Sequence, residues 1–274
     1  LYFRIDHFNK NLLSQMLRFG IVFFPAALFF MLIEMSDRWM LGLLRDINDV
    51  GLYGAGYKIG SIVLLLVNSF NLNWQPYYLK IGLSKGTVLF ESIGQHFILV
   101  LIFFATVLSM LWPIIFQYHV GSYYVVGPMF WEGGGIIPVV CLSYIFYGLF
   151  VLQMPSIYLK MKQAWAPVFW GTGFAINIIA NCTLIPRFGI YGAAYATLLA
   201  YCSMSMMLIY KNQSWLPIKY QINKLVLFCV FSVIAYYCAQ YVSAQYIYYI
   251  VVAYGAGSIY YIYKISRRLI PFLD

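Results

Sequence analysis

Eight long apolar runs, joined by short segments that hold most of the charge, constrain this chain more than any other feature. A helix needs about 20 apolar residues to cross the hydrocarbon core of a bilayer. Hydrophobic residues make up 63% of the 274 positions and charged residues only 9%, against about 25% in a typical soluble domain. The sequence therefore predicts an all-α integral membrane protein with eight transmembrane helices, over residues 18–44, 50–76, 96–117, 136–159, 165–185, 189–210, 223–243 and 246–264.

Basic residues are unevenly distributed among the connections between these runs. The chain has 17 Lys and Arg residues and a net charge of +9. Most of them lie in alternate connections, whereas the other set of connections holds only Arg45 and Arg187. Lys and Arg are enriched on the cytoplasmic side of a membrane, so we expect both chain ends in the cytoplasm, near anionic membrane lipids. Because the charge is not gathered in one patch, it does not favour nucleic-acid binding.

The cysteines and the connections carry no signal for a metal or a nucleotide. All five cysteines fall inside apolar runs without CxxC or Cys/His spacing. We expect them to be small buried hydrophobic side chains. No segment matches the GxxxxGK[ST] phosphate-binding loop. The sequence therefore predicts no metal site, no cofactor and no ATP hydrolysis.

Four ionisable side chains lie inside the first two apolar runs, namely Glu34, Asp37, Arg38 and Lys58. A charge at membrane depth costs about 2.5–3.5 kcal/mol on insertion scales, so it normally faces a bundle interior or a wet cavity. At 1.5 Å per helical residue, Lys58 lies about 12 Å below the outer surface, between Asp37 at about 10 Å and Glu34 at about 15 Å. The sequence predicts an ion pair between Lys58 and one of these acids. The alternative is that Asp37, Arg38 and Lys58 only hold the two helices together.

Polar side chains also repeat along one face of the second run. Ser61, Asn68, Asn71 and Gln75 are spaced by seven, three and four residues, which places them on one side of a helix. Lipid cannot satisfy their hydrogen bonds, so this stripe is expected to face protein or water. Hydrogen bonding between helices is one interpretation. An aqueous cavity is the interpretation that a stripe of this length favours.

A weaker polar pair in the fifth run has similar helical spacing. Asn177 and Asn181 lie at i and i+4 and so share a face, although amides in such positions also serve as packing hydrogen bonds. Together with the charges of the first two runs, these polar faces predict a water-accessible groove along the inner side of the first helical hairpin.

The two ends of the chain differ in character from its middle. Residues 1–17 mix basic and apolar positions, as an amphipathic segment at the membrane surface does. Residues 211–274 add two apolar runs without interior charge and with many tyrosines, so we expect them at the periphery. Residues 18–210 then form a six-helix unit. In the longest outer connection, the run Gly133–Gly135 predicts a flexible turn.

Four short motifs in the first two runs carry a family resemblance: Ser36-Asp37-Arg38-Trp39, Val50-Gly51-Leu52-Tyr53, Gly56-Tyr57-Lys58-Ile59 and Asn73-Trp74-Gln75-Pro76. Their order and spacing resemble the second-half signature of polysaccharide flippases of the O-antigen (Wzx-type) family. That family belongs to the multidrug/oligosaccharidyl-lipid/polysaccharide (MATE-like) exporter superfamily. The resemblance covers residues 36–76, with Gly54 where Ser or Ala is common, and the later runs match only in number and length.

The resemblance implies an architecture and an activity. Proteins of this family look like two six-helix lobes around a central cavity, with two extra C-terminal helices in some members. Under this reading, residues 18–210 are the second lobe, residues 211–274 are the extra pair, and residues 1–17 are the linker from a missing N-terminal lobe. The implied activity is that of a membrane transporter, not an enzyme. It flips undecaprenyl-pyrophosphate-linked oligosaccharide across the bacterial inner membrane by alternating access.

The resemblance also assigns roles to the polar residues of the spans. Basic side chains would hold the pyrophosphate and amides would hold the sugars: Arg38 and Lys58 for the former, and Asn68, Asn71, Gln75, Asn177 and Asn181 for the latter. Glu34 or Asp37 would carry a coupling proton. Three alternatives stay open: a multidrug or cation antiporter of the same fold, a membrane glycan polymerase or transferase, and a non-transporting scaffold. Stabilisation by lipid-linked sugar rather than by cationic drugs separates the flippase from the antiporter.

Overall fold

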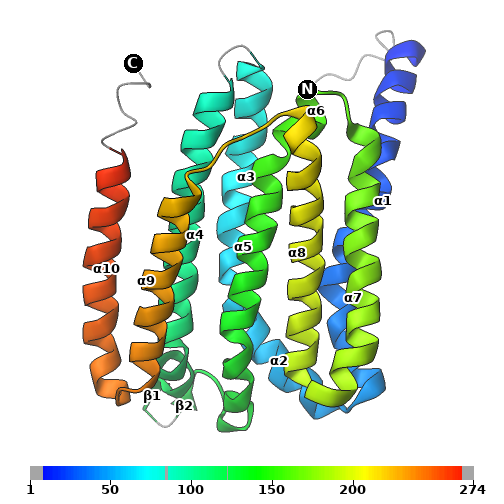
Figure 1. The fold of residues 1–274 in the computed structure, drawn as a ribbon. Helices are drawn as coiled ribbons and strands as arrows, with labels where there is room; N and C mark the ends of the chain where they lie inside the picture. The colour runs from blue at the N-terminus through cyan, green and yellow to red at the C-terminus, as the bar shows by residue number, and fades with distance from the viewer. Residues whose placement is uncertain (1–8, 84–85, 122, 267–274) are drawn as a thin grey trace, which may run out of the picture.

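The computed structural model describes residues 9–83, 86–121 and 123–266, and this part of the chain is almost entirely helical (Figure 1). Its only strands are the two-residue pair β1 (His119–Val120) and β2 (Tyr123–Tyr124), which pair antiparallel. The α-helices are α1 (Lys10–Leu44), α2 (Ile47–Gly60), α3 (Ile62–Ile81), α4 (Gly86–Gln117), α5 (Ile137–Gln153), α6 (Pro155–Leu159), α7 (Ala166–Phe188), α8 (Ile190–Trp215), α9 (Ile222–Gln240) and α10 (Ala244–Ser266). Two 3₁₀ helices, η2 (Pro128–Ile136) and η3 (Gln163–Trp165), precede α5 and α7.

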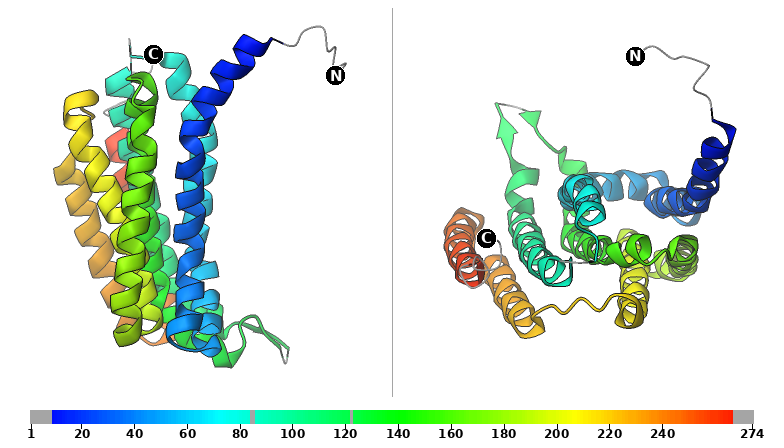
Figure 2. Two further views of the ribbon diagram at one scale, coloured as in Figure 1. Left: turned by 90° about the vertical axis from the view of Figure 1, so that its right-hand side faces the viewer. Right: turned by 90° about the horizontal axis from the view of Figure 1, so that it is seen from above.

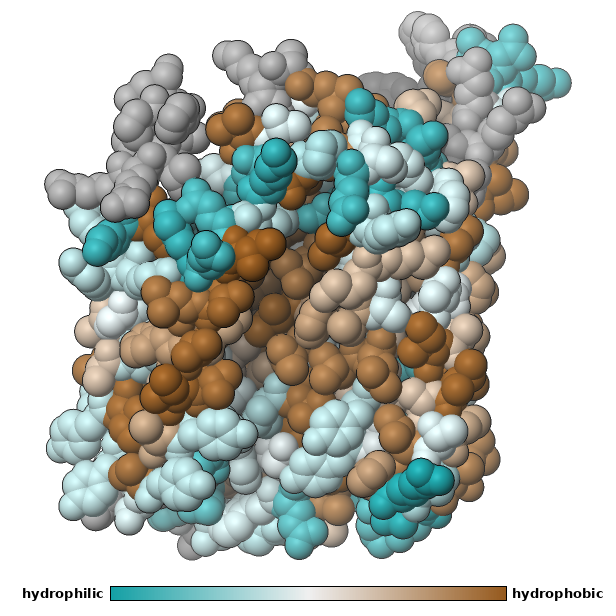
Figure 3. All heavy atoms as spheres, in the orientation of Figure 1, coloured by the Kyte–Doolittle hydropathy of each residue, from teal (hydrophilic) through white to brown (hydrophobic). Residues whose placement is uncertain are grey.

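The long helices run up and down a single bundle, and successive helices are antiparallel neighbours in most cases (Figures 1 and 2). Within the described residues, five helical segments are long and apolar enough to cross a membrane, or six if α2 and α3 count as one bent span. Helices α1 and α10 fall outside that count, although they lie alongside the others and are 35 and 23 residues long. Figure 3 shows the matching surface, with apolar residues across the middle and hydrophilic ones concentrated at the upper end. The all-α membrane fold is thus confirmed.

The first helix begins before the first predicted span. Residues 1–8 lie outside the described part, and α1 is continuous from Lys10 to Leu44. Asn9 caps it, because its side-chain oxygen accepts hydrogen bonds from the amides of Asn11 and Leu12 at 3.0 and 3.1 Å, as N-cap residues do. The first turns of α1 diverge from the bundle (Figure 2). Residues 10–17 are therefore helical and continuous with the first span.

The second predicted span is broken, which the sequence pattern did not indicate. Helices α2 and α3 meet at Ser61 with a bend of 44°. The Ser61 hydroxyl donates to the Lys58 carbonyl oxygen at 2.9 Å, and the Ser61 amide donates to the Tyr57 carbonyl oxygen at 2.8 Å. A side-chain donor of this kind takes over a carbonyl at the helix end. Asn68, Asn71 and Gln75 of the polar stripe consequently lie on α3, and Ser61 lies at the break between the two helices.

Close backbone contact between α2 and η2 fixes the end of the bundle opposite the N-terminal end of α1. A Cβ atom at Gly56 would lie 2.0 Å from the Gly133 carbonyl oxygen, and one at Gly133 would lie 2.1 Å from the Leu52 carbonyl oxygen. Both distances are far inside van der Waals contact, so only glycine fits. The run Gly133–Gly135 is therefore part of a packed 3₁₀ helix, and the predicted flexible turn is wrong.

Helices α9 and α10 form one edge of the bundle, where they pack on α4 (Figure 1). A small apolar cluster joins them, separate from the main core: Met110, Ala235, Ala239, Ile247 and Tyr254. The connection from α8 is held to α4 because the amides of Lys219 and Gln221 donate to the side chains of Glu91 and Gln95, each at 2.9 Å. The N-terminal end of α1 and the C-terminal end of α10 lie at the same end of the bundle.

The α2–η2 contact predicts a clear difference between two glycines of the same helix. Gly56→Ala should destabilise the fold by about 1–3 kcal/mol or more, because the new methyl group meets backbone that cannot move aside. Gly54→Ala is the matched control, since a Cβ there meets nothing within 4 Å and alanine favours a helix by about 0.5–1 kcal/mol. Thermal unfolding of the purified protein, followed by tryptophan fluorescence, measures both. Equal unfolding temperatures for the two variants would contradict the contact.

Candidate functional site

Two carboxylates on α1 point into the bundle. Glu34 and Asp37 are three residues apart, so they lie on one face of the helix. Asp37 is 1% exposed, and Glu34 is half-buried one turn away. Their surroundings come from α2, α5, α7 and α8, which are distant in the sequence.

Asp37 accepts four hydrogen bonds from three helices. The Tyr53 hydroxyl on α2 donates to Oδ2 at 2.6 Å, and the Thr197 hydroxyl on α8 donates to the same oxygen. The side-chain amides of Asn181 and Asn177 on α7 donate to Oδ1 at 2.9 and 3.2 Å. A buried carboxylate is tolerated only when its oxygens are hydrogen-bonded in this way.

Glu34 accepts its hydrogen bonds from tyrosines. The Tyr57 hydroxyl donates to Oε2 at 2.8 Å, and the Tyr201 hydroxyl donates to Oε1 at 2.5 Å. The Tyr144 hydroxyl on α5 lies 3.1 Å from Glu34 Oε2 and 2.5 Å from the Tyr57 hydroxyl, so it contacts both Glu34 and Tyr57. We call the whole group the acidic cluster: Glu34, Asp37, Tyr53, Tyr57, Tyr144, Asn177, Asn181, Thr197 and Tyr201.

The acidic cluster contains no basic side chain, which corrects the predicted ion pair. In residues 9–83, 86–121 and 123–266 the ion pair is between Arg45 and Asp49, at 3.0 Å, near the start of α2. Lys58 is exposed and makes no ion pair with Glu34 or Asp37. The physical reason is direction: each residue turns a helix by about 100°, and α2 already directs Tyr53 and Tyr57 at the acids.

Arg38 is the basic residue nearest to the cluster. Its guanidinium carbon lies 4.7 Å from the centre of the Tyr57 ring, over the ring face, in cation–π geometry. Its Nη1 also donates to the Glu34 carbonyl oxygen at 3.4 Å. Arg38 is half-buried, so it sits at the edge of the cluster. A charge on Arg38 and a charge on Glu34 therefore both act on the side chain of Tyr57.

The predicted polar stripe is at the surface of the described bundle. Asn68 is exposed, and Asn71 and Gln75 are half-buried. The buried side of α3 carries Val67 and Trp74 instead. The predicted site is thus divided in two. Four of its residues, Glu34, Asp37, Asn177 and Asn181, meet in the acidic cluster, whereas Lys58, Asn68, Asn71 and Gln75 do not reach it.

The predicted water-filled groove does not surround Asp37. Its side chain is sealed by protein groups, and every contact described above is a hydroxyl or an amide. One acceptor in the cluster stays unused, because the Asn181 Oδ1 atom is buried without a hydrogen-bond partner. Hydroxyl groups both donate and accept. The cluster therefore contains groups that can exchange donor and acceptor roles.

Five members of the cluster were not predicted from the sequence, and all five carry hydroxyl groups: Tyr53, Tyr57, Tyr144, Thr197 and Tyr201. Tyrosine in a membrane protein is most often interfacial, so the sequence alone does not mark these residues as members of a site, although Tyr53 and Tyr57 stand in the motifs of the family resemblance. A signal was present nevertheless. Tyr53 and Tyr57, and likewise Thr197 and Tyr201, are four residues apart and share a helix face.

A comparison with protein families gives one match, to the family described as polysaccharide biosynthesis protein, over residues 2–81. The match spans α1, α2 and α3, so it includes both acids, Arg38 and the polar stripe. It supports the resemblance seen in residues 36–76 and a role in polysaccharide biosynthesis or export as a multi-pass membrane protein. Proteins of this family are generally transporter-like and not enzymes. No curated protein and no solved structure matches the chain.

The acidic cluster predicts that single hydroxyl groups matter for stability. Tyr201→Phe leaves Glu34 Oε1 with only the 3.4 Å contact to Tyr144. A buried acceptor that loses its partner costs about 1–3 kcal/mol, so the variant should unfold at a lower temperature. Tyr195→Phe is the control, because Tyr195 lies on the same helix and is 41% exposed. Thermal unfolding in detergent compares the two. An unchanged midpoint for Tyr201→Phe would mean that the bond to Glu34 contributes nothing.

Proposed function

We propose that this chain is the transport lobe of a flippase for lipid-linked oligosaccharide in the bacterial inner membrane. The substrate is an undecaprenyl-pyrophosphate-linked sugar unit, and the protein moves it by alternating access. The observation that carries the proposal is the polar stripe at the surface of α3, where Asn68 is exposed and Asn71 and Gln75 are half-buried. The family match over residues 2–81 supports it.

Gln75 hydrogen-bonds to Tyr158, but the amides of Asn68 and Asn71 at the surface of α3 need a partner other than lipid. Asn68, Asn71 and Gln75 lie within a helix pair that has the length and hydropathy of one bent span. Hydrocarbon offers such groups no hydrogen bonds. Sugar hydroxyls and water in a central cavity do, and a second lobe on the other side of the cavity completes the enclosure. In this proposal a second lobe covers the face formed by α1, α2 and α3.

The basic residues of the same face suit the charged part of the substrate. Lys58 is exposed on α2 and Arg38 is half-buried on α1. Guanidinium and ammonium groups are the usual partners of phosphate. In the proposed cycle they hold the pyrophosphate, while the amides of the stripe hold the sugars. Asn177 and Asn181 are engaged with Asp37, so they act through the acidic cluster and not by touching sugar.

The acidic cluster is the proposed coupling element. It joins α1 to α2, α5, α7 and α8 through the two carboxylates. Protonation of Glu34 or Asp37 changes a carboxylate that only accepts into a carboxyl that also donates. The four surrounding helices then have a different set of hydrogen bonds to satisfy. An ion that prefers one arrangement shifts the equilibrium between the two.

A multidrug or cation antiporter of the same fold is the second candidate. The acidic cluster itself favours it, because two carboxylates surrounded by tyrosines suit an organic cation. The flippase and the antiporter differ in which residues of the α1–α3 face they need. The flippase depends on the amides of the stripe and on Lys58, whereas an antiporter for cations does not.

The proposal predicts that the stripe is needed for export. In a strain that lacks its own copy of the gene, the triple variant Asn68→Leu, Asn71→Leu, Gln75→Leu should lower surface glycan at least about tenfold, the change that 1.4 kcal/mol produces. Lipid-linked sugar should accumulate on the inner leaflet. Surface glycan, the lipid-linked intermediate and membrane abundance of the protein are measured together.

Asn73→Leu is the matched control for this experiment. Asn73 is exposed on α3, and its side chain donates to the Ser69 carbonyl oxygen of its own helix at 3.3 Å. It should leave export unchanged. Normal glycan export by the triple variant at normal abundance would overturn the flippase proposal. Loss of resistance to a cationic drug, with export intact, would favour the antiporter.

A further inference from the structure

A polar pocket lies at the end of the bundle opposite the N-terminal end of α1. It has a volume of about 520 Å³, within the range of small-molecule sites. Its walls come from the α1–α2 connection, α2, α4, η2 and the α7–α8 connection. We call it the outer-end pocket, and its lining residues are Arg45, Asp49, Leu52, Trp112, Glu132, Gly135, Phe188, Gly189, Ile190 and Tyr191.

Two glycines allow the walls of the outer-end pocket to come together. A Cβ atom at Gly135 would lie 2.0 Å from the Tyr191 hydroxyl oxygen. At Gly189 the backbone has φ +55°, a conformation that favours glycine, and a Cβ there would lie 3.2 Å from Arg45 Nη2. The Tyr191 and Arg45 side chains thus rest directly on glycine backbone. The pocket is a built feature of the fold and not a gap between loops.

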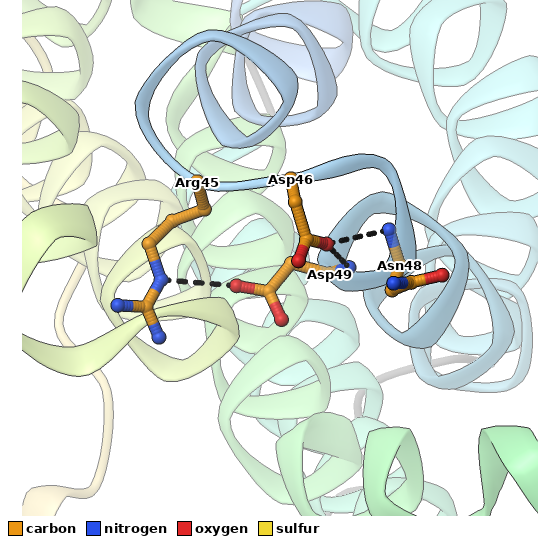
Figure 4. A network of polar contacts seen from close by, with 4 residues as sticks. All are labelled: Arg45, Asp46, Asn48 and Asp49. Carbon is orange, nitrogen blue, oxygen red and sulfur yellow. Dashed lines mark hydrogen bonds and ion pairs between the residues drawn. The ribbon is translucent and has the colours of Figure 1, made fainter.

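Two polar groups of the pocket, Arg45 and Asp49, hold each other in place. Arg45 Nε donates to Asp49 Oδ2 at 3.0 Å, and Asp46 caps α2 by accepting from the amides of Asn48 and Asp49 at 2.6 and 3.0 Å (Figure 4). The bond from Arg45 to Asp49 uses only Nε of the guanidinium, which has further donors on Nη1 and Nη2. Glu132 contributes a second carboxylate. The pocket therefore offers strong donors and strong acceptors side by side.

The remaining walls are aromatic and apolar. Trp112, Phe188 and Tyr191 line the pocket, and the Trp112 ring lies against Gly134, where a Cβ would be 2.1 Å away. An apolar ligand would cover the Glu132 carboxylate and the remaining Arg45 donors without offering them hydrogen bonds, which is costly. An anionic ligand would meet two carboxylates against one guanidinium. A sugar ring suits both the aromatic walls and the polar groups. Its C–H faces stack on aromatic rings, and its hydroxyls both donate and accept hydrogen bonds.

We propose that the outer-end pocket binds an uncharged sugar ring. This inference rests on the proposed function and deepens it, since it places one sugar of the transported unit at the outer end of the lobe. The geometry that carries it is the combination of aromatic walls, the fixed Arg45–Asp49 pair and Glu132 around a cavity of ligand size. The pocket is separate from both the acidic cluster and the polar stripe.

Saturation-transfer NMR on the full-length protein tests the proposal. The protein is held in lipid nanodiscs, because maltoside detergents themselves carry sugars. The probes are the methyl β-glycosides of glucose, galactose and N-acetylglucosamine, with inorganic pyrophosphate in competition. At least one glycoside should bind, and pyrophosphate should not displace it.

Two variants should weaken binding of that glycoside. Arg45→Gln removes charge-assisted donors and should weaken it about tenfold or more, the effect of losing a strong hydrogen bond. Gly135→Ala should weaken it by forcing the Tyr191 hydroxyl out of position. Arg187→Gln and Gly54→Ala are the controls. Arg187 is exposed near the same end of the bundle and does not line the pocket, and a Cβ at Gly54 meets open space.

Two results would overturn the inference: no binding of any of the three glycosides to the wild-type protein, or equal binding by Arg45→Gln. Neither result depends on transport. The flippase proposal is tested separately, because normal glycan export by the stripe variant would contradict it. The three substitutions of that variant lie on α3 and outside the outer-end pocket. The two failures are therefore distinguishable.

Discussion

The requirement that two buried carboxylates receive hydrogen bonds organises the interior of this bundle. Asp37 and Glu34 take their donors from α2, α5, α7 and α8. A carboxylate without donors is heavily penalised where water is absent. Apolar side chains, by contrast, find similar partners in lipid and in protein, so they discriminate weakly between neighbours. The acidic cluster therefore determines which helices surround α1, and packing determines how closely they approach.

Close approach is the second constraint, and glycine supplies it at the outer end. Gly56 and Gly133 bring the backbones of α2 and η2 into contact. That contact also fixes the two residues after Gly133, so that Gly134 lies against Trp112 and Gly135 lies against Tyr191. Compact packing and the outer-end pocket thus have a common origin. The run Gly133–Gly135 is held in place because each glycine packs against a different residue: Leu52, Trp112 and Tyr191 in turn.

Hydropathy predicts the helical segments of this chain because every membrane span must hide its backbone from lipid over a fixed length. Spacing along a helix also predicts correctly that Glu34 and Asp37 share a face, as do Asn177 and Asn181. The Lys58 ion pair fails because depth along a helix axis says nothing of direction around it. The tyrosine donors and the packed glycines were missed because their roles depend on neighbours that are distant in the sequence.

Arg38 and Tyr57 show how events on the cavity face and in the interior are able to influence each other. The Tyr57 hydroxyl binds Glu34, and its ring lies under the Arg38 guanidinium. A proton that moves Glu34 away from Tyr57 changes the position of that ring, and with it the support of Arg38. An anion drawn to Arg38 acts on the same ring from the other side. Because coupling between two sites is reciprocal, this shared side chain would link substrate binding to protonation in both directions in the proposed transport cycle.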